Sequence, residues 1–100
     1  MNPYYLRDGT PCTLEEFARR FEDPLEREVW TSELADGVMV STIWLGINHS
    51  FGDGPPRLFE TAVFHGMKQI RANLARRYST EAEARAGHAA VVAALTGEAP

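Results

Sequence analysis

Four side chains of the kinds that bind metal ions or transfer protons lie within seventeen positions of the sequence: His49, Asp53, Glu60 and His65. Zinc or iron accepts such ligands, and a metal-bound water would make the protein a small metal-dependent hydrolase. Strand geometry argues against this site, because Glu60 and His65 point to opposite faces of one strand. The spacing matches neither HxH nor HExxH. We therefore predict no metal site, no catalytic residue and no cofactor, and the hydrolase remains an alternative.

The loop between these histidines carries groups that bind anions. Its GDGPP segment has two glycines but lacks the lysine and the following helix of a phosphate-binding P-loop. Backbone N–H groups near Gly52 and Gly54 can nonetheless surround an anion, and Arg57 can neutralise it. Trp44 and Phe51 offer surfaces on which a base can stack, although most aromatic residues are expected in the core. We predict a ligand-binding site made of Trp44, Asn48, His49, Ser50, Phe51, Arg57, Glu60, Arg76 and His88.

Two members of this site, Glu60 and His88, also have structural interpretations. Glu60 shares a strand face with apolar residues, where an unpaired carboxylate is costly or has its pKa raised. It needs a partner, and Arg76 or Arg77 on the next predicted strand can supply one. Glu60 is therefore either part of a structural ion pair or a pocket group that accepts a hydrogen bond from a ligand. His88 is either a core histidine bonded to a backbone carbonyl or a ligand contact.

Cys12, the only cysteine, has a structural role available. It lies one residue before Thr13, the expected N-cap of a helix, and Phe17 stands at the fourth helical position, which is the spacing of a hydrophobic staple. A reactive thiolate is the alternative, with only Arg19 and Arg20 close in sequence to lower its pKa. A single cysteine forms no disulfide within the chain, which suits a reducing compartment. The serines show no nucleophile-elbow pattern.

Length and composition indicate one globular domain spanning residues 1–100, with 44% hydrophobic residues. The formal net charge is −4, and the ten lysines and arginines form no basic stripe, so duplex nucleic acid is a poor partner. No apolar run approaches the roughly 20 residues that cross a bilayer, and the N-terminus does not read as a signal peptide. We expect no membrane partner and a cytoplasmic location, in the host cell if the protein is phage-encoded.

Two helices are predicted from their end signals. Thr13 is the expected N-cap of the first helix, and Pro24 is expected to stop it. Thr80 is the expected N-cap of the second, where Glu83 completes a capping box and Gly97 ends the helix. With the strands between them, these helices predict an α+β fold: an antiparallel meander of three to four strands with one helix before and one after it.

The strands are predicted from alternation and turn residues. Two β-rich runs flank Asp36-Gly37, which suits a tight hairpin, and residues 58–65 form another strand. Residues 67–78 fit a helix or a strand, and we favour a turn followed by a strand that pairs with residues 58–65. Residues 38–47 carry large apolar side chains on both faces, so a helix or a second subunit must cover the second face. Because a chain this short has a small core, we expect a homo-oligomer.

Several separated motifs together resemble one protein family. Residues 42–64 read TIWLGINHSFGDGPPRLFETAVF and residues 76–92 read RRYSTEAEARAGHAAVV. They resemble a family of small uncharacterised proteins of phages, prophages and bacterial genomes. The shared pattern is a strand ending in Leu-Gly, a polar residue with His, a Gly-Pro loop, FETxVF, RYST and AxxGH, and it covers about half of the chain. The resemblance implies a phage-associated accessory protein with a strand before RYST, but it transfers no activity and no functional residue.

Three functions fit these observations. The first is a small binding module that captures a partner or a small anionic ligand, and the phage resemblance suggests a decoy that sequesters a nucleotide immune signal. The second is a protein-interaction or structural phage protein without a small ligand. The third is the metal-dependent hydrolase described above.

Overall fold

The computed structural model describes residues 3–48 and 54–97, so the predicted ligand residues His49, Ser50 and Phe51, and also Asp53, lie outside the described residues. The described chain is built from these elements: α1 (Leu14–Phe21), α2 (Pro24–Arg27), β1 (Glu28–Glu33), β2 (Val38–Trp44), β3 (Phe59–His65), β4 (Lys68–Ile70), β5 (Arg76–Tyr78) and α3 (Glu81–Thr96). Short 3-10 turns follow β1 and β4, at Ala35–Gly37 and Ala72–Leu74. The α+β class and the order of helix, antiparallel sheet and helix are confirmed.

Within the described residues, five strands form one antiparallel sheet with β3 at its centre. β1 pairs with β2, and β2 pairs with β3 along its whole length. The other side of β3 is shared, because β5 pairs with Phe59–Thr61 at one end and β4 pairs with Val63–His65 at the other. The predicted strand at the end of residues 67–78 is therefore present as β5, and β4 is an additional short strand before it.

The helix ends follow the predicted signals closely. Thr13 Oγ1 accepts a hydrogen bond from the Glu16 N–H at 3.2 Å and so caps α1. Thr80 and Glu83 form the complete capping box of α3, and Gly97 ends that helix with a φ of 76°. A positive φ at this position favours glycine because it has no Cβ. Within the described residues, no helix is long and apolar enough to cross a membrane.

The chain between α1 and β1 differs from the prediction. Pro24 was expected only to stop the first helix, but it is the first residue of the short helix α2. Asp23 is the N-cap of α2, and its Oδ1 accepts a hydrogen bond from the Leu25 N–H at 2.9 Å. Proline is favoured at the first helical position because its missing N–H would have no partner there. The same residue that prevents α1 from continuing therefore starts α2.

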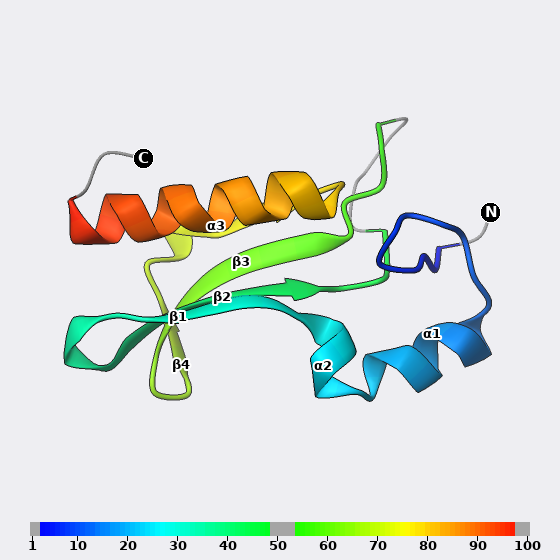
Figure 1. Ribbon diagram of the computed structural model, residues 1–100, viewed down its shortest axis with the longest axis horizontal. Coiled ribbons are helices and arrows are strands. Elements are labelled where there is room, and N and C mark those ends of the chain that lie inside the picture. Colours follow the sequence, from blue (N-terminus) through cyan, green and yellow to red (C-terminus); the bar gives the residue numbers. More distant parts are fainter. Residues whose placement is uncertain (1–2, 49–53, 98–100) are drawn as a thin grey trace.

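α3 lies across one face of the sheet, as Figure 1 shows. The inward side chains of α3 include Ala84, His88 and Val91, all of which are buried. They meet the alternating residues of β2 and β3 that face the helix: Val40, Thr42, Trp44, Phe59, Thr61 and Val63. A register shift between Glu28 and Trp30 in β1 forms a bulge, so Val29 joins the core beside Ala84 while Trp30 stacks on His88.

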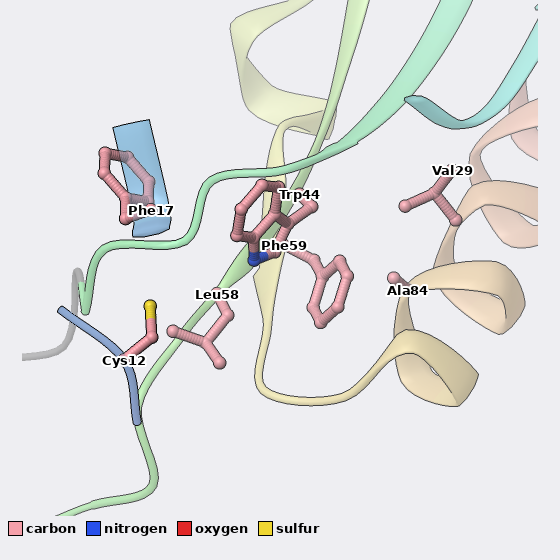
Figure 2. Close-up of a cluster of buried hydrophobic side chains, with 7 residues drawn as sticks. All are labelled: Cys12, Phe17, Val29, Trp44, Leu58, Phe59 and Ala84. Atoms are coloured by element: carbon pink, nitrogen blue, oxygen red, sulfur yellow. The ribbon is translucent and has the colours of Figure 1, made fainter. Parts of the chain in front are cut away.

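The largest apolar cluster lies at one end of the sheet, where side chains of α1, of the sheet and of α3 pack together. Figure 2 shows Trp44 between Phe17 of α1 and Phe59 of β3, with Ala84 of α3 beyond. Cys12 is buried in the same cluster as Phe17, which agrees with its predicted structural role. Burial is the main cause that raises the pKa of the Cys12 thiol, and the nearby Glu16 raises it further. The thiol is therefore protonated at neutral pH and poorly nucleophilic.

The other side of the sheet, away from α3, is called the open face. The strand register arranges its side chains in three rows that cross the strands. The first row is Glu28, Ile43, Glu60 and Arg77. The second is Thr31, Ser41 and Ala62. The third is Glu33, Met39, Phe64 and Gln69. The described chain covers these rows only in part, since Met39, Ser41, Ile43 and Phe64 all keep some exposure.

Candidate functional site

A hollow of about 380 Å³ lies on the surface at the β5 edge of the sheet. The side chains that line it come from the start of β3 and from the turn into β5: Arg57, Glu60, Ala75, Arg76 and Arg77. We call it the arginine hollow. Three of the predicted ligand residues, Arg57, Glu60 and Arg76, meet here, although Arg76 is sixteen positions beyond Glu60 in the sequence. Pairing of β3 with β5 brings them together.

Glu60 has the ion-pair partner that the sequence required. Glu60 and Arg77 are directly opposite each other in the β3–β5 pair, and the Arg77 Nε donates to Glu60 Oε2 at 2.9 Å. Arg77 is therefore the partner, rather than Arg76. The side chains of Arg77 and Glu60 remain 43% and 29% exposed, so this pair contributes at most about 1 kcal/mol to stability. Glu60 is thus a structural ion-pair member that also lines the hollow.

Arg76 is held by the backbone of its own turn. Its Nη1 donates to the carbonyl oxygens of Asn73 and Ala75, both at 2.8 Å. These two bonds leave the other guanidinium N–H groups of Arg76 unused by any bond within residues 3–48 and 54–97. The turn therefore fixes the position of the charge and leaves donors for a ligand.

Arg57 and Asn48 connect the hollow to the two ends of the loop between β2 and β3. The Arg57 backbone N–H donates to Asn48 Oδ1 at 3.3 Å, and the Asn48 N–H donates to the Pro3 carbonyl at 3.0 Å. Asn48 thus acts as a brace that fixes the backbone at Arg57. Among the described residues, no carboxylate pairs with the guanidinium of Arg57 or Arg76.

The charges that line the arginine hollow are unusual for this chain. Three arginines and one glutamate are among the described residues that line it, which gives these residues a formal charge of +2, whereas the whole chain carries −4. Guanidinium groups bind carboxylates and phosphates through paired N–H donors, and bonds between charged groups are about twice as strong as neutral ones. The hollow is therefore suited chemically to a small oxyanion.

A second polar cluster lies under α3, around His88. His88 is fully buried, with 0% exposure, and both ring nitrogens have hydroxyl partners. Nδ1 is 2.7 Å from Thr42 Oγ1, and Nε2 is 2.8 Å from Ser32 Oγ. Thr42 is in turn hydrogen-bonded to the buried Thr61, and Trp30 stacks on the imidazole with ring centroids 4.2 Å apart. We call these residues the His88 cluster.

The His88 cluster satisfies buried polar groups, and its imidazole is fully buried. A serine hydroxyl at 2.8 Å from an imidazole nitrogen has the spacing of a nucleophile and its base. The group that orients this imidazole is the neutral hydroxyl of Thr42, however, and not a carboxylate. Burial, and to a smaller degree the charge of Arg85, lowers the pKa of His88, so the ring is neutral at pH 7. His88 is a core histidine, bonded to hydroxyls rather than to the predicted backbone carbonyl.

Sequence reasoning missed the hydroxyl partners of His88. Thr42 and Thr61 alternate with large apolar residues on the helix-facing sides of β2 and β3, and both have 0% exposure. Two threonines at the centre of an apolar face signal that a polar group must meet them. His88 is a polar residue on the apolar face of α3, so the strand pattern signals a polar partner without selecting which strand residues bond to His88.

The structure separates the remaining predicted ligand residues from the arginine hollow. Trp44 is fully buried, and its rings pack on Phe17 and Phe21 at centroid distances of 5.8 and 6.0 Å. His65 lies at the far end of β3, where its Nε2 is 3.0 Å from the Asp36 carbonyl oxygen. Within residues 3–48 and 54–97, no three His, Cys, Asp or Glu side chains lie close enough together to hold a metal ion.

Comparison with known proteins adds no further constraint. No protein-family model, curated protein or solved structure matches this chain. The functional conclusion below therefore rests on the geometry and charge of the described residues.

Proposed function

We propose that this domain is a non-enzymatic binding module that captures a small anionic ligand in the arginine hollow. The observation that carries this proposal is the described lining of that hollow, where three arginines and one glutamate come together on a chain of net charge −4. An anion in the hollow offsets the mutual repulsion of the arginines and gains charge-assisted hydrogen bonds.

The positioning of the arginines supports binding with little loss of side-chain freedom. Arg76 is held by two backbone carbonyls and Arg77 by Glu60, before any ligand arrives. Side chains that are already ordered lose less conformational entropy when a ligand binds, so more of the interaction energy appears as affinity.

The described lining of the hollow contains no aromatic side chain, so its recognition rests on charge. The ligand class is therefore one with a phosphate, sulfate or carboxylate group. A nucleotide immune signal, sequestered by a phage accessory protein, is the specific ligand that the family resemblance suggests. In that case its phosphate would occupy the arginine hollow, and its base would contact other surfaces.

Calorimetric titration and thermal unfolding with inorganic phosphate, pyrophosphate, and cyclic and ADP-ribose-type nucleotides would test this proposal. We expect at least one of these anions to bind and to raise the midpoint of unfolding, with affinity that falls as salt is added. Arg57→Gln should weaken binding by about tenfold or more, because it removes a charged donor. Arg57→Lys, which keeps the charge and loses the paired donors, should fall between wild type and Arg57→Gln.

Arg19→Gln is the matched control, because it removes an exposed arginine of α1 outside the hollow. It should leave anion binding unchanged. If none of the anions binds, or if Arg19→Gln and Arg57→Gln weaken binding equally, the hollow is not the ligand site.

A protein-interaction role without a small ligand is the second candidate, and the partly exposed apolar side chains of the open face favour it. No observation among the described residues favours the metal-dependent hydrolase. Of its expected ligands, Glu60 pairs with Arg77 and His65 contacts the Asp36 carbonyl.

A further inference from the structure

The open face of the sheet carries apolar side chains that the described chain leaves partly exposed. Met39, Ile43 and Phe64 project from the two central strands on this side, and each remains partly exposed. Leu25 of α2 stands beside them with 81% exposure, next to a hollow that Ile43 and Ser41 also line. Central strands normally have both faces covered when both carry large apolar residues.

We propose that the open face is the interface between two copies of this chain. A second copy supplies the same combination of apolar side chains and opposite charges, and two-fold pairs of identical surfaces are the commonest arrangement of homo-oligomers. This inference does not depend on anion binding, although Glu60 and Arg77 belong both to the open face and to the lining of the arginine hollow.

The charges on the open face differ between its two edges. The β1 edge is acidic, with Glu28 in the first row and Glu33 in the third, and both are exposed. The opposite edge carries Arg77 in the first row and the neutral Gln69 in the third. The β1 edge of the open face is therefore acidic, and the opposite edge carries a cation, Arg77. Two copies of this face are complementary in charge when the acidic edge of one lies over the opposite edge of the other.

Two open faces can be stacked about a two-fold axis that runs either parallel to the strands or across them. Only one of these two arrangements brings opposite charges together. A two-fold axis parallel to the strands places β1 of one copy over the β5 edge of the other and keeps the rows aligned. Glu28 then faces Arg77 of the second copy, and Met39 faces Phe64 of the second copy. An axis across the strands would instead place Glu28 over Glu33 of the second copy, where like charges repel. The register therefore selects the axis parallel to the strands.

The middle row permits close approach of the two sheets. It consists of the small side chains of Thr31, Ser41 and Ala62, whereas the bulkier groups lie in the outer rows. Figure 1 shows α2 at one end of the open side and the β3–β4 hairpin at the other. When the axis is parallel to the strands, α2 of one copy lies over the part of the second copy that is away from its own α2, and the same holds for the β3–β4 hairpins. These elements of the two copies therefore do not collide.

Light scattering after size exclusion, on the full chain over a wide range of concentrations, would test the proposed dimer. We expect a mass of twice 11.1 kDa. Glu28→Arg alone and Arg77→Glu alone should each weaken the dimer by about tenfold or more, and the double variant should restore most of the loss. Glu22→Arg, which makes the same charge change at the exposed end of α1, should have no effect.

Ser41→Arg provides a second variant that does not depend on charge pairing. Ser41 is partly exposed in the middle row, so a long side chain there keeps the monomer folded but holds the two sheets apart. We expect a monomeric protein with an unchanged far-ultraviolet circular dichroism spectrum. A wild-type protein that is monomeric at every concentration would overturn the inference. A dimer that persists in Ser41→Arg, or that is insensitive to both single charge reversals, would equally show that another surface is used.

Discussion

The two faces of the sheet both place polar groups on β3, but they treat them in opposite ways. On the helix side, Thr42 and Thr61 are closed into the His88 cluster, where every member is uncharged and where Thr42, Thr61 and His88 are fully buried. On the open face, the polar group of β3 is the ionised Glu60, which is paired with Arg77 and remains partly exposed. Two neighbouring residues of β3 thus differ: Thr61 makes a neutral hydrogen bond on the helix side, whereas Glu60 forms an ion pair on the open face.

This difference shows that burial of a strand face under a helix decides whether its polar groups are neutral or charged. Under α3, a charge would lack water, and a neutral imidazole with two hydroxyl partners satisfies its hydrogen bonds without any net charge. On the open face, water remains in contact with Glu60 and Arg77, so an ion pair is tolerated and contributes little. Stability therefore depends on the His88 cluster, whereas the proposed charge-dependent binding would use the other side.

Removal of the imidazole should produce the largest effect. His88→Ala leaves a cavity in the core and removes the partner of the buried Thr42 hydroxyl. We expect the free energy of unfolding to fall by about 3–5 kcal/mol. Urea unfolding measures this change, and a loss below about 1 kcal/mol would show that the His88 cluster is not essential to the core.

A slightly smaller effect is expected where α3 meets β5. A Cβ added at Gly87 would lie 2.1 Å from the Tyr78 Oη, a distance that requires the helix or the tyrosine to move. We expect Gly87→Ala to destabilise the fold by about 1–3 kcal/mol, even though alanine favours helices. The ring atoms Cε1 and Cζ of Tyr78 would lie almost as close as the hydroxyl, so Gly87→Ala should recover part of the loss only where the ring is removed, in a Tyr78→Ala background. Calorimetric unfolding of the two variants would show no such recovery if the contact were unimportant.

The pH dependence of stability distinguishes the two faces further. Burial lowers the pKa of His88 below its ordinary value of 6.5, with a smaller contribution from Arg85, and the groups that contact the ring are uncharged. The unfolded chain therefore takes up a proton at this residue before the folded chain does. Stability is complete above pH 6.5 and declines as the pH falls toward the lowered pKa of the folded state.

Urea midpoints measured between pH 7.5 and 5 would reveal this decline. The matched variant is His88→Gln, which has no titrating imidazole and should show a flatter profile over the same range. If wild type and His88→Gln have parallel profiles, the pH dependence arises elsewhere.

Breaking the Glu60–Arg77 pair should have the smallest effect on stability. Because both side chains are partly exposed, Glu60→Gln should change the free energy of unfolding by less than about 1 kcal/mol. The same substitution removes the only carboxylate among the described residues that line the arginine hollow, so anion affinity should rise. Unfolding and anion titration on the same sample check both expectations, and a large loss of stability would contradict the contrast between the faces.

Local sequence signals predicted most of the fold because they describe local physics. The N-caps Thr13 and Thr80, the hairpin at Asp36-Gly37 and the strand alternation around Glu60 depend on neighbours in sequence. Pro24 was read only as a stop because a helix of four residues lacks the periodicity that would announce it. The bulge at Val29 likewise has no local signature that separates it from a regular strand.

The candidate site was predicted in part. Pairing of residues 58–65 with a later strand was sufficient to place an arginine beside Glu60, and only the register selected Arg77 over Arg76. Trp44 was included because aromatic residues near a loop can stack on ligands, but the tertiary packing of α1 buries it completely. The partners of His88 come from two strands far from it in sequence, so single-element patterns could not select them.

The central position of β3 has a consequence for hydrogen exchange. This strand has β2 along one side and both β4 and β5 along the other, so its amides open only when much of the sheet separates. Amides of this kind exchange with solvent at rates set by global unfolding, whereas those near chain turns exchange through local opening. The arginine hollow therefore has Glu60 on the most protected strand and Arg57 just before it. Because a bound anion raises the free energy of global unfolding, it would slow exchange at Glu60 as well as on the Arg57 side.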